Sequence, residues 1–494
     1  MPFQKKILFR ADGNNTTGLG HLYRLFALVE VYKPYFDVIF LTKESSTKES
    51  IPVQYPVDFI PEAITILQEP QWISEHYLSS EHLIIADGYQ FNETYQKQIK
   101  QLDFKLVYID DLIESHMYAD VVVNHAANVD TKLYKKEPYT SIALGTEYAI
   151  LRPAFIKAAQ KNKETISQIS NVFVCFGGAD ALDLSLKVTK ALQQLNQIRM
   201  IHVVLGAAYK QTEIFELAAT QPNRVILYKN LDELRLVELM ESCQLGIAPS
   251  STIVYELCSV KMPIVSGYFV ENQKGIYQAL INENAIFGAG NLVDYTAEDF
   301  KRFIEPIINN QNYKPYLAAQ QRLFDGQSAS RFVKLLNDLF ISFRKATADD
   351  MLLVYDWSND PLVRQNSYDS KPIQLEDHQA WFLSKIVNDK TLFLIALYDG
   401  IPAGVIRFEM DTDHSVIGIL VANTFRGKKL SSSLLSESSK YYFKQNHLPI
   451  FAYIKEENKA SVKAFESAGY SFYRKEKVKE FSSFVYKLEK KDVT

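Results

Sequence analysis

The chain has 494 residues, with 54 lysines and arginines against 58 aspartates and glutamates, so its formal net charge is −4. This balance excludes a basic chain that coats nucleic acid, and no apolar run approaches the ~18 residues of a membrane span. The 3 cysteines lack metal-ligand spacing and are too few for a disulfide framework. At roughly 150 residues per domain, we expect a cytoplasmic protein of about three domains, with no metal, nucleic acid or membrane to bind.

Short apolar runs alternate with amphipathic stretches over the first two thirds of the chain. Buried parallel strands are expected at residues 6–10, 38–42, 82–86, 106–109 and 121–124, and a helix at 22–32. After a polar stretch at 157–170, the same rhythm restarts at 172–176, 200–205, 225–227, 245–248 and 264–265. The alternation predicts two Rossmann-like α/β domains, at residues 1–160 and 161–341. Such folds bind ligands at the carboxyl ends of their strands.

The pattern changes near residue 342. The expected elements are an antiparallel hairpin at 391–398 and 403–410, a strand at 415–421 and a helix at 434–443. A basic loop joins that strand to that helix. The mixture predicts a separate α+β domain at residues 342–494, which is an ordinary domain size.

The first expected strand ends in a glycine-rich segment. Arg10 and Asp12 close the strand, and Gly18-x-Gly20-His21 precedes the first helix. Glycines at such a junction let backbone N–H groups approach a ligand. Histidine titrates near neutral pH, which suits a general base. A tight turn with a histidine at a helix end explains the segment equally well.

Further motifs follow this segment in a fixed order. They are Arg24 three residues after His21, Asp87-Gly88-Tyr89, Ile109-Asp110-Asp111, Val123-Asn124, Gly145 to Arg152, Gly177-Gly178-Ala179-Asp180 and Ser250 to Glu256. Together they resemble the UDP-2,4-diacetamido-2,4,6-trideoxy-β-L-altropyranose hydrolases of pseudaminic acid synthesis, over residues 4–340. The resemblance implies a GT-B-like pair of Rossmann-type domains, the second of which holds most of the UDP. It also implies hydrolysis at the anomeric carbon, with His21 as the general base.

The same resemblance implies substrate contacts in both domains: Arg10, Asp12, Gly20, Asp87, Tyr89, Arg152, Gly178, Ser251, Thr252, Glu256, Asn272 and Gln273. Ser251 and Thr252 precede a helix whose N-terminus suits a diphosphate, although simple N-capping also explains them. Glu256 is expected to accept hydrogen bonds from ribose hydroxyls, or to be a solvated helix residue. Asp87 is also explained as a turn residue at a strand end. Asn272-Gln273 is also explained as an ordinary polar loop.

The basic loop of the C-terminal domain carries a second chemistry. Backbone N–H groups in a strand–loop–helix segment can cradle a pyrophosphate, and the loop resembles the acetyl-CoA loop of GNAT acetyltransferases. Lys429 stands where that loop has glycine, and Ser431 where it has glycine or alanine. A basic surface loop is the other interpretation. With acetyl-CoA as cosubstrate, the implied contacts are Val421, Arg426, Gly427, Lys428, Lys429, Leu430, Ser431, Ser432, Asn458, Ser461 and Phe465.

Residues 458–470 resemble the GNAT segment Asn-x-x-Ala/Ser-x-x-x-Tyr/Phe-x-x-x-Gly-Phe. Many relatives have tyrosine where this chain has Phe465, and that tyrosine protonates the leaving thiolate. The general acid is therefore dispensable here or comes from another tyrosine, such as Tyr453 or Tyr470. Glu409 is the candidate base for the amine, with an exposed strand glutamate as the alternative.

Two tryptophan-containing segments extend this resemblance. Residues 357–364 and 376–382 resemble Trp-x-Asn-x-x-x-Val-Arg and Glu-x-His-x-x-Trp segments of GNATs that acetylate nucleotide sugars, including the acetyltransferase of the pseudaminic acid pathway. They make Arg364 and His378 candidate substrate contacts. The tryptophans themselves are also explained as core aromatics.

The two resemblances imply consecutive steps in one chain. The first is acetyl-CoA-dependent N-acetylation of UDP-4-amino-4,6-dideoxy-β-L-AltNAc, and the second is hydrolysis of the acetylated UDP-sugar to UDP and free sugar. Two alternatives stay open: a GT-B glycosyltransferase fused to an amino-sugar acetyltransferase, and a chain in which one domain only binds ligand. The sequence leaves open the stereochemistry of the amino sugar and whether the chain forms a homo-oligomer.

Overall fold

The computed structural model describes residues 5–14, 19–48, 51–127, 129–166, 168–310 and 312–492. The chain divides into two compact units, with the boundary between Arg331 and Phe332. This boundary lies inside helix α12 (Ser328–Phe340), slightly before the predicted one at 341/342. The reason is that the end of α12 packs in the second unit, where Asn337 donates a hydrogen bond to the carbonyl of Lys428.

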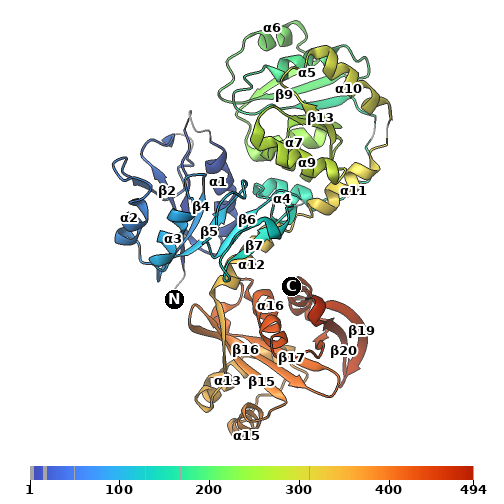
Figure 1. Cartoon of the computed structure of the whole chain (residues 1–494). Helices are drawn as coiled ribbons and strands as arrows, with labels where there is room; N and C mark the ends of the chain where they lie inside the picture. Colours follow the sequence, from blue (N-terminus) through green and yellow to red (C-terminus); the bar gives the residue numbers. More distant parts are fainter. Residues whose placement is uncertain are drawn as a thin grey trace. The chain divides into compact units, whose positions relative to one another are not determined.

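The first unit opens with a seven-stranded parallel sheet in the order β3-β2-β1-β4-β5-β6-β7. Its strands are β1 (Lys6–Arg10), β2 (Asp37–Lys43), β3 (Val57–Ile60), β4 (His82–Asp87), β5 (Lys105–Ile109), β6 (Val121–Asn124) and β7 (Ser141–Leu144). Helix α1 (Gly20–Tyr32) lies on one side of the sheet, and α2 (Glu69–His76) and α3 (Glu93–Gln101) lie on the other (Figure 1). The strand order reverses between β1 and β4, which are paired in register. Ligands bind at such a switch point.

The second sheet of this unit is parallel and has the order β10-β9-β8-β11-β12-β13. Its strands are β8 (Asn171–Val174), β9 (Met200–Leu205), β10 (Val225–Lys229), β11 (Leu245–Pro249), β12 (Ile264–Tyr268) and β13 (Phe287–Asn291). The helices are α4 (Pro153–Ala159), α5 (Leu184–Gln193), α6 (Glu213–Thr220), α7 (Glu233–Ser242), α8 (Thr252–Val260), α9 (Lys274–Asn282), α10 (Ala297–Asn310) and α11 (Lys314–Leu323). Although α4 precedes β8 in the chain, it packs against α7 and α8.

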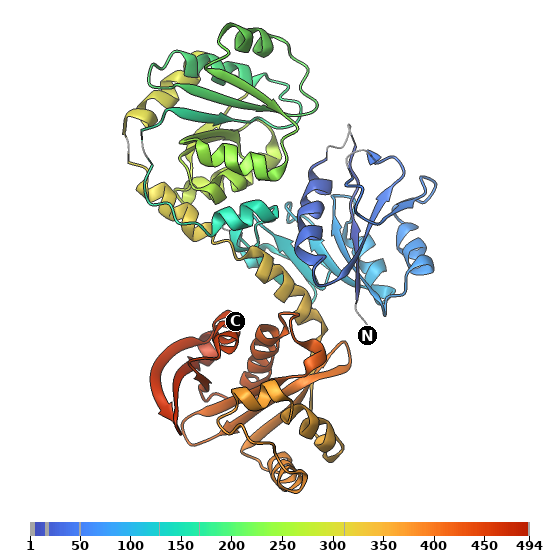
Figure 2. The same cartoon turned by 180° about the vertical axis from the view of Figure 1, so that it is seen from behind.

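The second unit is built on a seven-stranded sheet in the order β14-β15-β16-β17-β18-β20-β19. Its strands are β14 (Ile341–Lys345), β15 (Thr391–Tyr398), β16 (Ile401–Met410), β17 (Ser415–Val421), β18 (Ile450–Lys455), β19 (Ser471–Val478) and β20 (Phe481–Leu488). Its helices are α13 (Met351–Ser358), α14 (Pro361–Asn366), α15 (Leu375–Ile386), α16 (Leu430–Phe443) and α17 (Lys459–Ser467). Figure 2 shows α16 on the face of the sheet opposite α13 and α15.

One strand pair in this sheet is exceptional. β17 and β18 run parallel and pair only at Ser415–Ile450 and Val416–Phe451, whereas the other neighbours are antiparallel over most of their length. Beyond these two positions the strands separate and leave an opening in the middle of the sheet. The predicted fold class, two parallel α/β domains followed by an α+β domain, is confirmed. Within the described ranges, no helix combines the length and apolar character needed to cross a membrane.

Candidate active sites

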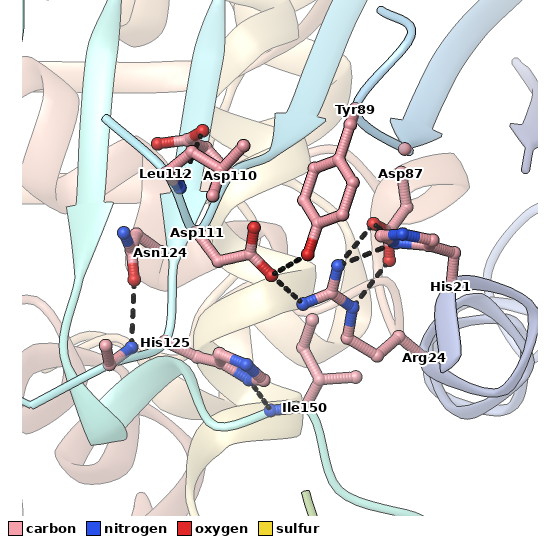
Figure 3. Close-up of polar contacts among 12 residues, drawn as sticks. His21, Arg24, Asp87, Tyr89, Asp110, Asp111, Leu112, Asn124, His125 and Ile150 are labelled. Atoms are coloured by element: carbon pink, nitrogen blue, oxygen red, sulfur yellow. Dashed lines mark hydrogen bonds and ion pairs between the residues drawn. The ribbon is translucent and has the colours of Figure 1, made fainter. Parts of the chain in front are cut away.

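The first candidate site lies at the switch point between β1 and β4 (Figure 3). His21 is in the first turn of α1, and Asp87 is the last residue of β4. The His21 Nδ1 lies 2.7 Å from the Asp87 Oδ1. One turn further along α1, Arg24 donates from Nε and Nη2 to the two oxygens of Asp87 at 2.8 and 2.6 Å. The structure therefore brings together His21 and Asp87, which the sequence predicted from separate motifs.

Electrostatics fix the tautomer of His21. Burial raises the pKa of Asp87, but the Arg24 charge and the hydrogen bond from His21 outweigh it and hold that pKa below its usual value. An ionised carboxylate only accepts hydrogen bonds, so the His21 Nδ1 must carry a proton and donate it. Arg24 Nη2, although 2.9 Å from that nitrogen, then donates to Asp87. In the neutral imidazole this tautomer leaves the lone pair on the His21 Nε2, as a general base requires.

Tyr89 closes one side of this site. Its ring meets the His21 ring edge to face, with the centroids 4.9 Å apart, and its hydroxyl lies 3.5 Å from the Asp111 carboxylate. Asp111 also accepts a hydrogen bond from Arg24 at 3.0 Å. Burial raises the pKa of Tyr89, while a hydrogen bond with the Asn272 side chain opposes that rise. Asn272 follows β12, so residues of both parallel sheets reach the same site.

Arg10 and Asp12 form an internal network. Arg10 is fully buried, and its guanidinium donates to Glu69 at 2.7 and 2.8 Å and to Asp12 at 2.8 Å. A guanidinium enclosed by two carboxylates has no face left for a substrate, so the interpretation of Arg10 as a direct contact does not fit; it joins β1 to α2. Gly20 begins α1, and nothing lies within 4 Å of where its side chain would be. Gly18 lies outside the described residues.

His125, directly after β6, belongs to the same neighbourhood and is not among the residues predicted from the sequence (Figure 3). It is buried, and its Nδ1 accepts a hydrogen bond from the Ile150 backbone at 3.4 Å. Burial and the nearby Arg24 charge lower the pKa of His125 to about 3. The imidazole is therefore neutral, with its remaining proton on Nε2. The sequence does give one indication of His125, because it is a polar residue at the end of a buried strand.

We expect His125 to make the first unit less stable in acid. Its folded-state pKa of about 3 lies below the ~6.5 of an unfolded imidazole, so the unfolded chain binds more protons between these values. Stability therefore falls as the pH drops below 6.5. In H125Q, the loss of unfolding free energy between pH 6 and 5 should be smaller than in the wild type by about 1 kcal/mol. Urea unfolding at both pH values measures this; equal losses in the two proteins would contradict it.

The carboxyl end of the second sheet carries the predicted diphosphate contacts. Thr252 is the first residue of α8, and Ser251 occupies the N-cap position without a capping hydrogen bond from its side chain. N-capping therefore does not explain Ser251, and the first-turn N–H groups of α8 suit an anion. Gly178 follows β8, and nothing lies within 4 Å of where its side chain would be. Gly177 has a φ of +85°, which favours glycine.

Glu256 and Arg152 form an ion pair. Arg152 donates from Nε and Nη2 to the two carboxylate oxygens of Glu256, each at 2.8 Å. Glu256 is buried, so it is not a solvated helix residue. Burial raises its pKa, and the Arg152 charge opposes that rise. Gln273 is also internal, since its Oε1 accepts a hydrogen bond from the Phe269 backbone at 3.0 Å, whereas Asn272 is exposed.

In the second unit, the predicted cofactor loop connects β17 to α16. Gly427 has a φ of +79°, and Lys429 has a φ of +55° and a ψ of 25° at the N-cap of α16. Lys429 thus adopts the left-handed conformation that favours glycine, at a cost of about 1 kcal/mol. The loop therefore turns as expected although lysine replaces glycine. Because α16 has no side-chain cap, its first N–H groups are suited to a phosphate.

A cavity of about 360 Å³ lies where β17 and β18 separate. The predicted cofactor contacts that line it are Val421, Arg426, Ser431, Asn458, Ser461 and Phe465. Those that do not are Gly427, Lys428, Lys429, Leu430 and Ser432; Leu430 is buried in the core. A groove that runs from the start of α16 between two diverging strands suits a long, narrow ligand with a phosphate at one end.

A second cavity of about 740 Å³ adjoins the first. Both cavities are lined by Val363, Ser367, Gly418, Ile419 and Leu420. The predicted substrate contacts Arg364 and His378 line the second one. Burial lowers the pKa of His378, and its Nε2 has no hydrogen-bond partner in the described part of the chain. Two cavities with a common wall can hold two reactants whose reacting groups meet.

The structure does not support Glu409 as the base for the amine. Glu409 is absent from the lining of both cavities and pairs with Lys385 and, at 2.7 Å, with Arg407. Burial raises the pKa of Glu409, but these two cations outweigh it and lower that pKa. Tyr470 is also unsuitable as the acid, because it is buried in the core with its hydroxyl 2.9 Å from that of Ser439. Tyr453 does line the smaller cavity.

Comparison with known families identifies the second unit. Residues 341–471 match the family model of the acetyltransferase (GNAT) domain. These residues form a GNAT domain. The match covers the strand opening, the cofactor loop and the lining of both cavities up to the start of β19. The matched residues thus contain all of the cofactor and substrate contacts predicted for the C-terminal part.

The N-terminal region is homologous to a UDP-sugar hydrolase. The UDP-2,4-diacetamido-2,4,6-trideoxy-β-L-altropyranose hydrolase of Campylobacter jejuni is 27% identical over 54% of this chain and 93% of its own length. The spore coat polysaccharide biosynthesis protein SpsG of Bacillus subtilis is 26% identical over 67% of this chain and 97% of its own length. An uncharacterized protein of Methanocaldococcus jannaschii is 26% identical over 95% of this chain and 97% of its own length. The last relative spans both units.

Solved structures also align with part of the chain. The aminoglycoside acetyltransferase AAC(6')-Ib, in complex with acetyl-CoA and an aminoglycoside, is 18% identical over 31% of this chain and 94% of its own length, with a TM-score of 0.29. A domain from Methanocaldococcus jannaschii is 25% identical over 30% of this chain and 97% of its own length, with a TM-score of 0.27.

Proposed function

We propose that the chain is a bifunctional enzyme of pseudaminic acid biosynthesis. In this proposal the GNAT domain acetylates the 4-amino group of UDP-4-amino-4,6-dideoxy-β-L-AltNAc. The first unit then hydrolyses UDP-2,4-diacetamido-2,4,6-trideoxy-β-L-altropyranose to UDP and free sugar. The observation that carries the proposal is the His21–Asp87 pair, which lies in the region homologous to a hydrolase of that UDP-sugar. The GNAT match supports acetyl-CoA as the cosubstrate.

In this proposal His21 is the general base of hydrolysis. The Nε2 lone pair takes a proton from water, and the water oxygen attacks the anomeric carbon. The bond between that carbon and the diphosphate oxygen breaks, and UDP leaves with the electron pair. Asp87, held ionised by Arg24, stabilises the imidazolium that forms. The N-terminus of α8 beside Ser251 stabilises the charge on the departing diphosphate.

Acetyl transfer uses the two adjoining cavities. In the proposal, acetyl-CoA occupies the smaller cavity, with its pyrophosphate at the start of α16, and the amino sugar occupies the larger one. The amine meets the thioester at the common wall, beside Gly418. His378 is neutral because burial lowers its pKa, so its unpartnered Nε2 accepts a hydrogen bond from the amine.

Hydrolysis in ¹⁸O-labelled water tests the first-unit assignment directly. The protein is given UDP-2,4-diacetamido-2,4,6-trideoxy-β-L-altropyranose without acetyl-CoA, and the products are weighed by mass spectrometry. The proposal expects UDP release with the label in the free sugar, because water attacks the anomeric carbon. Label in UDP would contradict attack at that carbon. Release that requires an added sugar acceptor would identify a glycosyltransferase instead.

A further inference from the structure

Residues 359–373, which include α14, form a loop of the GNAT domain that closes on itself. The Asn359 side chain makes two hydrogen bonds with the Ile373 backbone, at 3.1 and 2.8 Å, where the loop begins and ends. Val363 and Ser367 of this loop line both cavities. Compact loops whose ends meet are frequently functional, and this one forms part of the wall that both proposed reactants share.

Arg364 holds the loop together from within. Its Nε donates to the Ser358 carbonyl at 2.7 Å. Its two Nη atoms donate to the Asp369 carbonyl at 3.2 Å and to the Ser367 Oγ at 2.9 Å. Because one planar guanidinium binds acceptors on both sides of α14, the loop keeps its internal shape. A shift at its beginning therefore also moves the residues that line the cavities.

Asp360 joins this loop to the cofactor loop. Its Oδ1 caps α14 by accepting hydrogen bonds from the backbone N–H groups of Leu362 at 3.0 Å and Val363 at 3.3 Å. The same oxygen accepts a hydrogen bond from the Arg426 Nη1 at 2.9 Å, and Arg426 lines the smaller cavity. Burial raises the pKa of Asp360, but Arg426 and the two N–H groups outweigh it and lower that pKa. The carboxylate is therefore ionised and pairs with the cofactor loop.

The position of α14 depends on such contacts. The helix has 6 residues, which is too short to be stable by itself. Arg426 is in turn attached to the end of β17, where its Nε donates to the Val421 carbonyl at 3.3 Å. A ligand that orders the cofactor loop therefore also fixes Arg426, its partner Asp360 and the start of α14. Val363 and Arg364, which follow on this helix, line the larger cavity.

We propose that Asp360 is a positioning residue that transmits the binding of CoA from the smaller cavity to the wall of the larger one. This inference rests on the proposed acetyltransferase activity of the GNAT domain. Acetyl-CoA orders the cofactor loop, the Arg426–Asp360 ion pair fixes the 359–373 loop, and the amino sugar meets a wall already in place. Such preorganisation lowers the entropic cost of binding the second ligand. Asp360 itself does not line either cavity in the described part of the chain.

Hydrogen exchange of the full chain, with and without CoA, tests this link in the absence of an acceptor. Saturating CoA should slow the exchange of backbone amides in residues 361–373 of the wild type. In D360S this protection should be lost, because serine still caps a helix but is too short to reach Arg426. Equal protection in both proteins would show that CoA acts on the loop directly, and would overturn the inference.

The matched control for the exchange experiment is Y368F. The Tyr368 hydroxyl donates to the Ser483 Oγ of β20 at 2.8 Å, so this variant removes a different anchor of the same loop. It leaves the Arg426–Asp360 pair intact and should keep the protection by CoA. Loss of protection in Y368F as well as in D360S would mean that any loosening of the loop has this effect, which would contradict a specific role of Asp360.

Steady-state acetylation of UDP-4-amino-4,6-dideoxy-β-L-AltNAc tests the consequence for the second substrate. At saturating acetyl-CoA, D360S should lower kcat/KM for the amino sugar by about tenfold, within the range of coupling between two sites. The KM for acetyl-CoA should change little. R426Q should lower kcat/KM for the amino sugar to a similar extent, and the double variant little further, because each single change removes the same ion pair.

Two outcomes of these kinetics separate the inference from the proposed function. An equal loss of kcat/KM for both substrates in D360S would indicate a general loss of structure and would overturn the positioning role. A wild type that shows the protection by CoA, absent from D360S, but leaves the amino sugar unmodified would overturn only the proposed acceptor.

Discussion

Replacing Asp87 with asparagine should lower kcat for UDP release by about 10³-fold, within the range of general base catalysis. Asparagine can donate to the His21 Nδ1 from its amide, which favours the tautomer whose Nε2 carries the proton and cannot act as a base. H21Q should cause a similar loss, and the double variant should lose little more than either single one, because the two residues act as a unit. The rate of UDP release at saturating UDP-sugar gives kcat for all three variants and tests this prediction.

The matched control for this series is D111N. Asp111 shares the Arg24 contact with Asp87 but makes no contact with His21. The D111N variant should therefore lose much less UDP-releasing activity than D87N. Acetyl transfer by the GNAT domain of the same preparations should be unchanged, since that domain is a separate compact unit. Equal losses in D87N and D111N would mean that Arg24 pairing, rather than the His21 tautomer, governs the reaction.

Gly418→Val should lower acetyl transfer at least about 100-fold, the effect expected when reactants are displaced by about an ångström. Gly418 lies in the wall that the two cavities share. A β-carbon there would lie 3.7 Å from the Arg407 Nη2, which is ordinary contact, so the further methyl groups of valine must displace Arg407 or enter a cavity. Kinetics with acetyl-CoA and the amino sugar, together with hydrolysis by the first unit as an internal reference, measure the effect.

Gly418→Ala is the control that keeps this prediction falsifiable. A single methyl group fits at 3.7 Å from Arg407, so we expect activity within a few-fold of the wild type. If valine is tolerated as well as alanine, the amine and the thioester do not meet at this wall.

The sequence predicted the architecture well because its signals were local. Buried parallel strands such as β4 are continuous apolar runs, which periodicity reveals. Two of the strands that it missed have weak signals: β3 is only partly buried, and β13 contains two glycines, Gly288 and Gly290, which weaken strand propensity. The boundary between the two units lies inside α12 and not after it. The contacts that place it there, such as that of Asn337 with Lys428, come from tertiary packing, which local sequence patterns do not show.

For the candidate sites, the sequence indicated individual residues but not the contacts between them. Motifs indicated His21 and Asp87, but their hydrogen bond depends on the pairing of β1 with β4, which links positions far apart in the chain. For the same reason the sequence did not show that Arg10 is enclosed by Glu69 and Asp12. Glu409 has a residue type suited to a base, but only the structure shows that it lies outside both cavities.

In the proposed function, one chain acetylates a UDP-amino sugar and then hydrolyses the product. Mass spectrometry of the purified protein with UDP-4-amino-4,6-dideoxy-β-L-AltNAc, with and without acetyl-CoA, tests it most directly. We expect UDP and a free diacetamido sugar only when acetyl-CoA is present. Acetylation without UDP release, or UDP release that does not depend on acetyl-CoA, would contradict it.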